Sequence, residues 1–190
     1  MGAMPMKRAI AALLLVAAVL LSGCAPHVRP RPAGQTPLAA VRNAVTAYGT
    51  PSGDGTYCLQ QQKGAFVFTI AAPRENGVRS SLQMNAGALC HSFEILLDAP
   101  NGDCPCSYTV TGGDEPLRLT GRIAARAYPK AGSITVDEHG DYPAAQAREL
   151  FEQFTPLLLR ATQEMLAECG AAASVQDFFP NFSCESSTRL

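Results

Sequence analysis

Cysteines are the side chains in this sequence with the widest chemical range. Two thiolates can hold a soft metal ion, and two thiols can be oxidised to a disulfide. Apart from Cys24, the chain contains Cys58, Cys90, Cys104, Cys106, Cys169 and Cys184. An even number in an exported chain predicts up to three disulfides, although the sequence cannot choose among the possible pairings.

Cys104-Pro105-Cys106 places two thiols on either side of a single residue. This is not the Cys-x-x-Cys spacing of thioredoxin-type redox motifs, so we expect no redox activity. The pair could hold copper or zinc. We favour instead two cystines at a hairpin tip, because Cys104 and Cys106 are too close to pair comfortably with each other and each could reach another cysteine. A bridge between Cys169 and Cys184 is one candidate. No metal or cofactor is expected.

The first residues carry the features of a secretory signal. Lys7 and Arg8 precede an apolar stretch over residues 9–21, which is shorter than the ~20 residues that an α-helix needs to cross a bilayer. Leu21-Ser22-Gly23-Cys24 follows and resembles the lipobox of bacterial lipoprotein precursors. The resemblance implies that residues 1–23 are removed as a signal peptide and that acyl chains such as palmitate on Cys24 anchor the protein in the membrane.

Residues 24–37 are expected to form a spacer between the lipid and the domain. They include Pro26, Pro30, Pro32 and Pro37 and little hydrophobic bulk, which favours an extended and solvated chain. Residue 25 is alanine, whereas an aspartate at this position often marks inner-membrane retention in lipoproteins of this type. The resemblance therefore implies the outer membrane, facing the periplasm, whose oxidising conditions favour disulfides.

Two helices are predicted within a single domain over residues 38–190. Apolar residues recur every three or four positions from 38 to 48, and Gly49 ends this short amphipathic helix. Residues 143–169 form the longest helix, which Asp141 or Tyr142 would cap. Pro156 should kink this helix or split it in two.

Strands are predicted between the two helices. Residues 66–70 and 78–84 alternate in the way that suits a sheet buried mainly on one face. A hairpin about Asn101-Gly102 would place Phe93 opposite Val110, although prolines nearby favour a wider tip. A second hairpin, turning at residues 129–132, would place Ala127 opposite Ile134.

These elements predict an α+β fold. The sheet is expected to be an antiparallel β-meander of about five or six strands, with both helices packed on one face. The alternative is a strongly curved sheet that wraps around the long helix and leaves a cavity between them. Phe178, Phe179 and Phe182 near the C-terminus are expected to fill the core.

Arg118, Arg122 and Arg126 form the most basic stretch of the predicted sheet. On one extended face, neighbours would lie about 13 Å apart, so they could line a groove for a polyanion or a partner but could not clamp one small anion. The simpler interpretation, which we favour, is a solvated strand face that uses arginine for solubility.

The acidic run from Asp137 to Asp141 contains His139 and could hold a divalent cation. It lacks the ligand spacing of a calcium loop, so a polar connection to the following helix is the favoured interpretation. Neither a nucleophile elbow, a zinc-protease motif nor a phosphate loop occurs in the sequence. We therefore expect a protein that is not an enzyme.

The formal net charge of −1 becomes more negative once Lys7 and Arg8 are removed, which argues against nucleic-acid binding. The leading hypothesis is a membrane-anchored envelope lipoprotein whose domain is a non-catalytic structural or partner-binding module. The alternative is a carrier for a small apolar or anionic ligand held between the sheet and the long helix. A third hypothesis is metal-dependent hydrolysis around His139.

Overall fold

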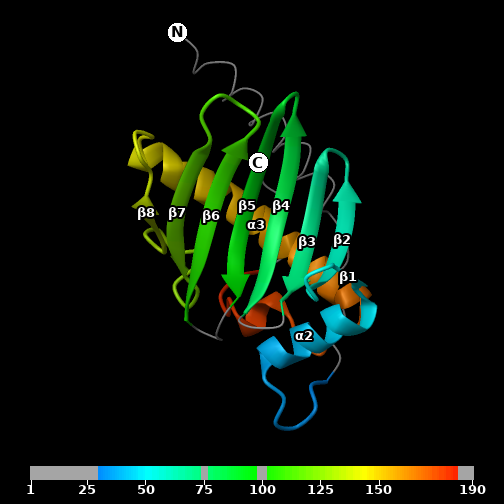
Figure 1. Cartoon of the computed structure of the whole chain (residues 1–190). Helices are drawn as coiled ribbons and strands as arrows, with labels where there is room; N and C mark the ends of the chain where they lie inside the picture. The colour runs from blue at the N-terminus through cyan, green and yellow to red at the C-terminus, as the bar shows by residue number, and fades with distance from the viewer. Residues whose placement is uncertain (1–29, 74–76, 98–101, 184–190) are drawn as a thin grey trace.

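The computed structural model describes residues 30–73, 77–97 and 102–183. Within them, eight antiparallel strands form one open sheet in which each strand pairs with its neighbour in sequence (Figure 1). The strands are β1 (Thr50–Pro51), β2 (Tyr57–Lys63), β3 (Phe66–Ala72), β4 (Val78–Ala86), β5 (Leu89–Leu97), β6 (Asp103–Thr111), β7 (Leu117–Ala124) and β8 (Ile134–Glu138). The predicted α+β meander is thus confirmed, but with more strands than the five or six expected.

The additional strands are β1 and β2, at one edge of the sheet. In β2 the side chains that face inward change from apolar to polar, because Gln61 and Lys63 meet acidic residues of the long helix rather than a hydrophobic core. Gln61 Nε2 lies 3.2 Å from the carboxylate of Glu168, and Lys63 forms an ion pair with Glu164. The usual alternation of apolar and polar residues is therefore missing from this strand.

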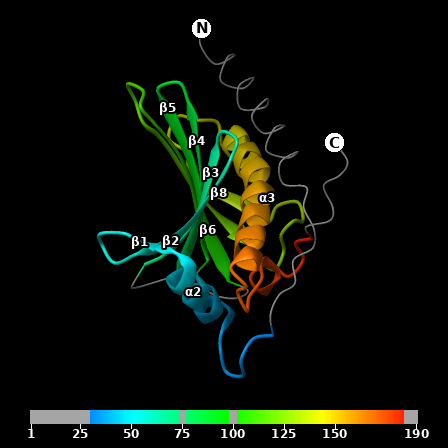
Figure 2. The same ribbon diagram turned by 90° about the vertical axis from the view of Figure 1, so that its right-hand side faces the viewer.

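The long helix α3 (Ala144–Glu168) crosses one face of the sheet (Figure 2). Its buried stripe packs aromatic rings against the inner side chains of β5 and β6, with Phe154 lying 5.8 Å from Phe93 and 5.5 Å from Tyr108 between ring centroids. Pro156 lies inside this helix without splitting it. The predicted cap is wrong, since Pro143 occupies the N-cap position and no side chain caps the helix.

The short helix α2 (Pro37–Tyr48) begins one residue before the predicted start and ends at the predicted residue. The Thr36 hydroxyl accepts a hydrogen bond from the Ala39 amide at 3.2 Å, and Gly49 follows the last turn. Val41 and Val45 are fully buried, and the helix packs at the ends of β2, β3 and β4 (Figure 1).

Both predicted hairpins keep the expected faces but not the expected register. Phe93 pairs with Tyr108 rather than with Val110, a shift of two residues that leaves the same side chains pointing inward. Residues 98–101, which include the predicted turn residue Asn101, lie outside the described part of the chain. The loop between the strands is therefore centred one residue earlier than predicted.

In the second hairpin, Ile134 pairs with Ile123 rather than with Ala127. Strand β7 ends at Ala124 because the backbone then forms consecutive turns, in which the amides of Ala127 and Tyr128 both donate to the Ala124 carbonyl at 2.9 Å. These turns use the residues that the prediction assigned to the strand.

The C-terminal segment closes one end of the core. After the 3-10 helix η1 (Val175–Asp177), Phe178 and Phe179 are fully buried and Phe182 is nearly so, as predicted. Phe179 and Phe182 pack against Tyr128 in the turn after β7, with ring centroids 5.9 and 6.1 Å away.

Candidate functional site

The two faces of the sheet differ in what they contact. Inward side chains meet α3, which leaves the opposite face of the sheet uncovered (Figure 2). At the β2 edge, α2 and β1 approach this opposite face beside Cys58 and Gln60. The outward positions are exposed or half-buried and are mostly small and polar. We refer to this outward surface, over β2 to β8, as the open face.

Strand pairing arranges the open face into rows that run across the sheet. One row, here the central row, joins seven strands through successive partners: Gln60, Thr69, Ser81, Glu94, Ser107, Thr120 and Glu138. At about 4.8 Å between strands, it extends over roughly 29 Å. Each member is polar, and Glu94 lies between the hydroxyls of Ser81 and Ser107.

A second row lies beside the central row. On each strand its residue is two positions from the central-row residue, alternately after and before it because the strands are antiparallel. It consists of Gln62, Val67, Gln83, Ser92, Thr109 and Arg118. The two rows together present amides, hydroxyls and isolated charges at regular spacing. No aromatic side chain occurs in them, so stacking on flat apolar ligands is not available to either row.

The three arginines do not form one basic strand face. Arg122 lies on the open face, but its guanidinium donates to Asp137 at 3.0 Å, and this hydrogen bond raises its pKa. Arg118 is exposed opposite Thr109. Arg126 lies beyond the end of β7 in the turn, where its carbonyl accepts a hydrogen bond from Asn181 at 2.6 Å. The expectation of three arginines on one strand is therefore wrong.

Cys104 and Cys106 lie within β6 rather than at a hairpin tip, and their side chains are buried on the inner face. Burial raises the pKa of the Cys106 thiol to about 12, with a further contribution from Asp137, so this thiol stays protonated near neutral pH. No group of three His, Cys, Asp or Glu side chains able to hold a metal occurs in the described ranges.

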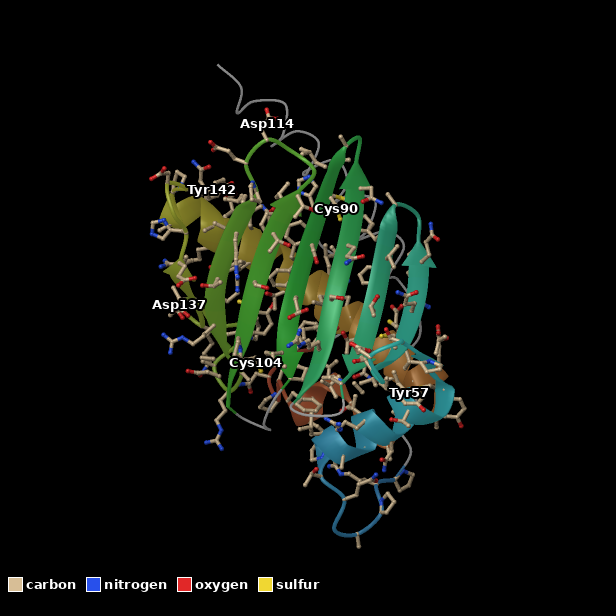
Figure 3. All side chains as sticks on the ribbon, viewed as in Figure 1. Tyr57, Cys90, Cys104, Asp114, Asp137 and Tyr142 are labelled. Atoms are coloured by element: carbon tan, nitrogen blue, oxygen red, sulfur yellow. The ribbon has the colours of Figure 1, made fainter. Side chains whose placement is uncertain are left out.

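The other described cysteines lie far from this pair. Cys58 and Cys90 lie on the outward side of the sheet near opposite ends of the strands, and Cys169 follows α3. Figure 3 shows Cys90 and Cys104 near opposite ends of the sheet. Register places Cys58 in line with Leu96, six residues along β5 from Cys90, or about 20 Å along the strand, too far for a disulfide.

No cystine joins any two cysteines within the described part of the chain. No disulfide therefore joins Cys58, Cys90, Cys104, Cys106 and Cys169 to one another, while the expectation of up to three disulfides also involves Cys184 and stays a prediction. Cys184 lies outside the described residues, so its pairing with Cys169 stays a prediction.

The acidic run after β8 forms structural contacts. His139 Nδ1 lies 2.7 Å from the Tyr142 carbonyl, Asp137 pairs with Arg122, and Asp141 does not cap α3. These contacts agree with the interpretation of the run as a polar connection.

A buried His91–Tyr108 pair is a polar site that the sequence analysis did not find. His91 Nδ1 lies 2.7 Å from the Tyr108 hydroxyl, and the two residues are only 2% and 1% exposed. Burial lowers the pKa of His91 and raises that of Tyr108, so both stay neutral at pH 7. The shared inward parity of His91 and Phe93 is the signal in the sequence that could have indicated this burial.

A hollow of about 390 Å³ lies where α2 meets β1 and β2. Tyr48, Pro51 and Cys58 contribute to its wall, and Tyr48 is 63% exposed, the one exposed large hydrophobic side chain in the described ranges. Burial and the nearby Asp54 raise the pKa of Cys58, which makes its thiol less reactive rather than more.

Comparisons of the chain with protein-family models, curated proteins and solved structures find no match. Among the helices in the described part of the chain, none is both long and apolar enough to span a membrane.

Proposed function

We propose that the protein is a lipid-anchored lipoprotein of the bacterial envelope whose domain serves as a non-catalytic, partner-binding or structural module. Acyl chains on Cys24 hold it in the outer membrane, facing the periplasm. The lipobox residues before Cys24 support the anchor. The open face of the sheet supports the partner-binding role.

The open face is the observation that carries the proposal. An antiparallel sheet needs only one buried face to fold, and α3 supplies that burial here. The opposite face is therefore not needed to form the hydrophobic core. It nevertheless extends over seven strands with an ordered pattern of hydrogen-bonding groups. A broad, mainly polar surface of this kind suits a reversible, hydrated contact with another envelope protein.

The carrier alternative needs space between the sheet and the long helix. In the described residues this layer is filled around Phe154, whose ring packs against both Phe93 and Tyr108. This packing favours the binding module over the carrier.

The anchor is tested by replacing Cys24. We expect Cys24→Ala to abolish incorporation of labelled palmitate and to release the protein from the membrane fraction, whereas Cys58→Ala retains both. Label that persists in Cys24→Ala protein, or an unaltered chain recovered without lipid, would contradict the anchor.

The binding face is tested by photo-crosslinking in intact cells. A photoreactive residue at Ser81 or Ser107, in the central row, should give a crosslinked product that is absent when the residue is placed at the exposed Gln153 of α3. Thr120→Arg, which adds a bulky charge to the same row, should weaken that product at least five-fold. Equal products from all three positions would refute a specific face.

A further inference from the structure

An arginine of the predicted spacer is bound to the C-terminal segment. Arg31 Nη2 lies 2.9 Å from Asp177 Oδ1, and the two side chains are only 29% and 23% exposed. The other carboxylate oxygen of Asp177 accepts a hydrogen bond from the Ser174 amide at 2.8 Å, within the cap of η1. Asp177 is therefore held in place by its own helix and can fix the arginine through a charge-assisted bond.

The chain between Arg31 and α2 is also folded. The Gln35 amide donates to the Pro32 carbonyl at 3.1 Å, which closes a turn, and Thr36 then caps the helix. The structure thus differs from the expectation of an extended, solvated spacer up to residue 37. The first side chain fixed to the domain after Cys24 is therefore Arg31 among the described residues, rather than a residue of α2.

This attachment limits how far the lipid can lie from the domain. The seven links from Cys24 to Arg31 span at most about 24 Å, whereas the thirteen links from Cys24 to Pro37 would span about 44 Å. Fixing Arg31 therefore removes almost half of the reach of the tether.

The fixed point lies at one end of the molecule. Residues 30–36 and α2 lie beyond one set of strand ends in Figure 1, and the loop that contains Asp114 lies at the opposite end in Figure 3. A strand of nine residues such as β6 separates these ends by about 30 Å. A tether of about 24 Å that leaves the α2 end cannot bring the lipid to the Asp114 end.

We propose that the Arg31–Asp177 ion pair is a clamp that orients the domain on the bilayer. The α2 end faces the lipid, the Asp114 loop points away from it, and the strands rise from the membrane. The open face is then roughly perpendicular to the membrane plane, so a partner can approach it from the side. This inference rests on the lipid anchor at Cys24 proposed above, and it adds the bilayer surface as the neighbour of the α2 end.

The test uses the full lipidated chain in vesicles of phosphatidylethanolamine and phosphatidylglycerol. A photoreactive residue replaces either Asn43, which is exposed on α2, or Asp114, and crosslinking to lipid is measured for each. We expect at least five-fold more lipid adduct from position 43 than from position 114. Arg31→Gln, which keeps the cap of η1, should bring this ratio close to one, whereas Arg31→Lys should retain most of it.

Arg118→Gln is the matched control, because it removes the same charge from the open face, and it should leave the ratio unchanged. Flotation of the vesicles is measured first. A chain that does not float overturns the anchor, and the inference with it. A chain that floats but crosslinks equally from both positions, or whose ratio is unaffected by Arg31→Gln, overturns only the clamp.

Discussion

The two faces of the same sheet are under different physical constraints. On the inner face, the apolar side chains of β3 to β7 are buried beneath α3, and the rings of Phe93 and Tyr108 both pack against Phe154. On the open face, neighbouring strands contribute Ser, Thr and Gln in rows, and hydrogen bonds between side chains join Gln60 to Thr69 and Thr120 to Glu138. The stability of the fold therefore resides mainly on the inner face, so residues of the open face can change at little cost in free energy of unfolding.

The sharpest test of this contrast is a truncation on each face. Phe154→Ala should lower the free energy of unfolding by about 3–5 kcal/mol, because it removes a ring that is buried between Phe93 and Tyr108. Ser107→Ala on the open face should change it by less than about 0.5 kcal/mol. Urea denaturation measures both, and similar losses from the two variants would contradict the contrast.

Gly121 tests how closely the helix approaches the sheet. A Cβ at this position would lie 2.6 Å from Phe151 Cε2 and 2.4 Å from the Thr135 carbonyl. Gly121→Ala should therefore cost about 1–3 kcal/mol of unfolding free energy through overpacking. Gly53→Ala is the control, since a Cβ there would meet nothing within 4 Å, and it should leave the urea midpoint unchanged.

The His91–Tyr108 pair tests whether the inner face depends on pH. Because burial lowers the pKa of folded His91, the unfolded chain binds the proton more readily, and stability should be complete above about pH 6.5 and fall below it. The fall in unfolding free energy between pH 7.5 and pH 5.5 should be smaller in His91→Gln than in the unaltered protein. An identical pH dependence in the two proteins would mean that His91 is not the group responsible.

The smallest effect is expected on the open face. Arg122→Gln breaks the ion pair with Asp137, but both side chains are well exposed to solvent, so the urea midpoint should not change measurably. A clear loss of stability would show that the open face contributes to folding.

Much of the fold could be predicted from the sequence because local rules determine it. The periodicity over residues 38–48 and Gly49 predicted α2 and its end, and the inward parity of Phe93 and Ile95 follows from strand alternation. Strand β2 was missed because Gln61 and Lys63 contact Glu168 and Glu164, residues more than a hundred positions away in sequence. The pattern of residues within a short stretch of sequence cannot reveal such long-range contacts.

The candidate site could be predicted only in part. The polar residues Arg79, Ser81 and Gln83 indicated an outward face of β4, but the central row depends on the register of every strand. Register in turn depends on the turn lengths, and the turns after Ala124 shifted β8 from its expected position. The link between Arg31 and Asp177 joins the two ends of the chain and carries no local signal.

The order of the strands has a consequence for how the chain acquires its structure. Each hairpin of the meander joins neighbours in sequence, so the sheet can assemble progressively from its N-terminal strands onward. The helix that covers it comes last, after residue 143, and until then the aromatic side of the sheet is exposed to water. A chain interrupted before α3 should therefore aggregate unless a chaperone shields it.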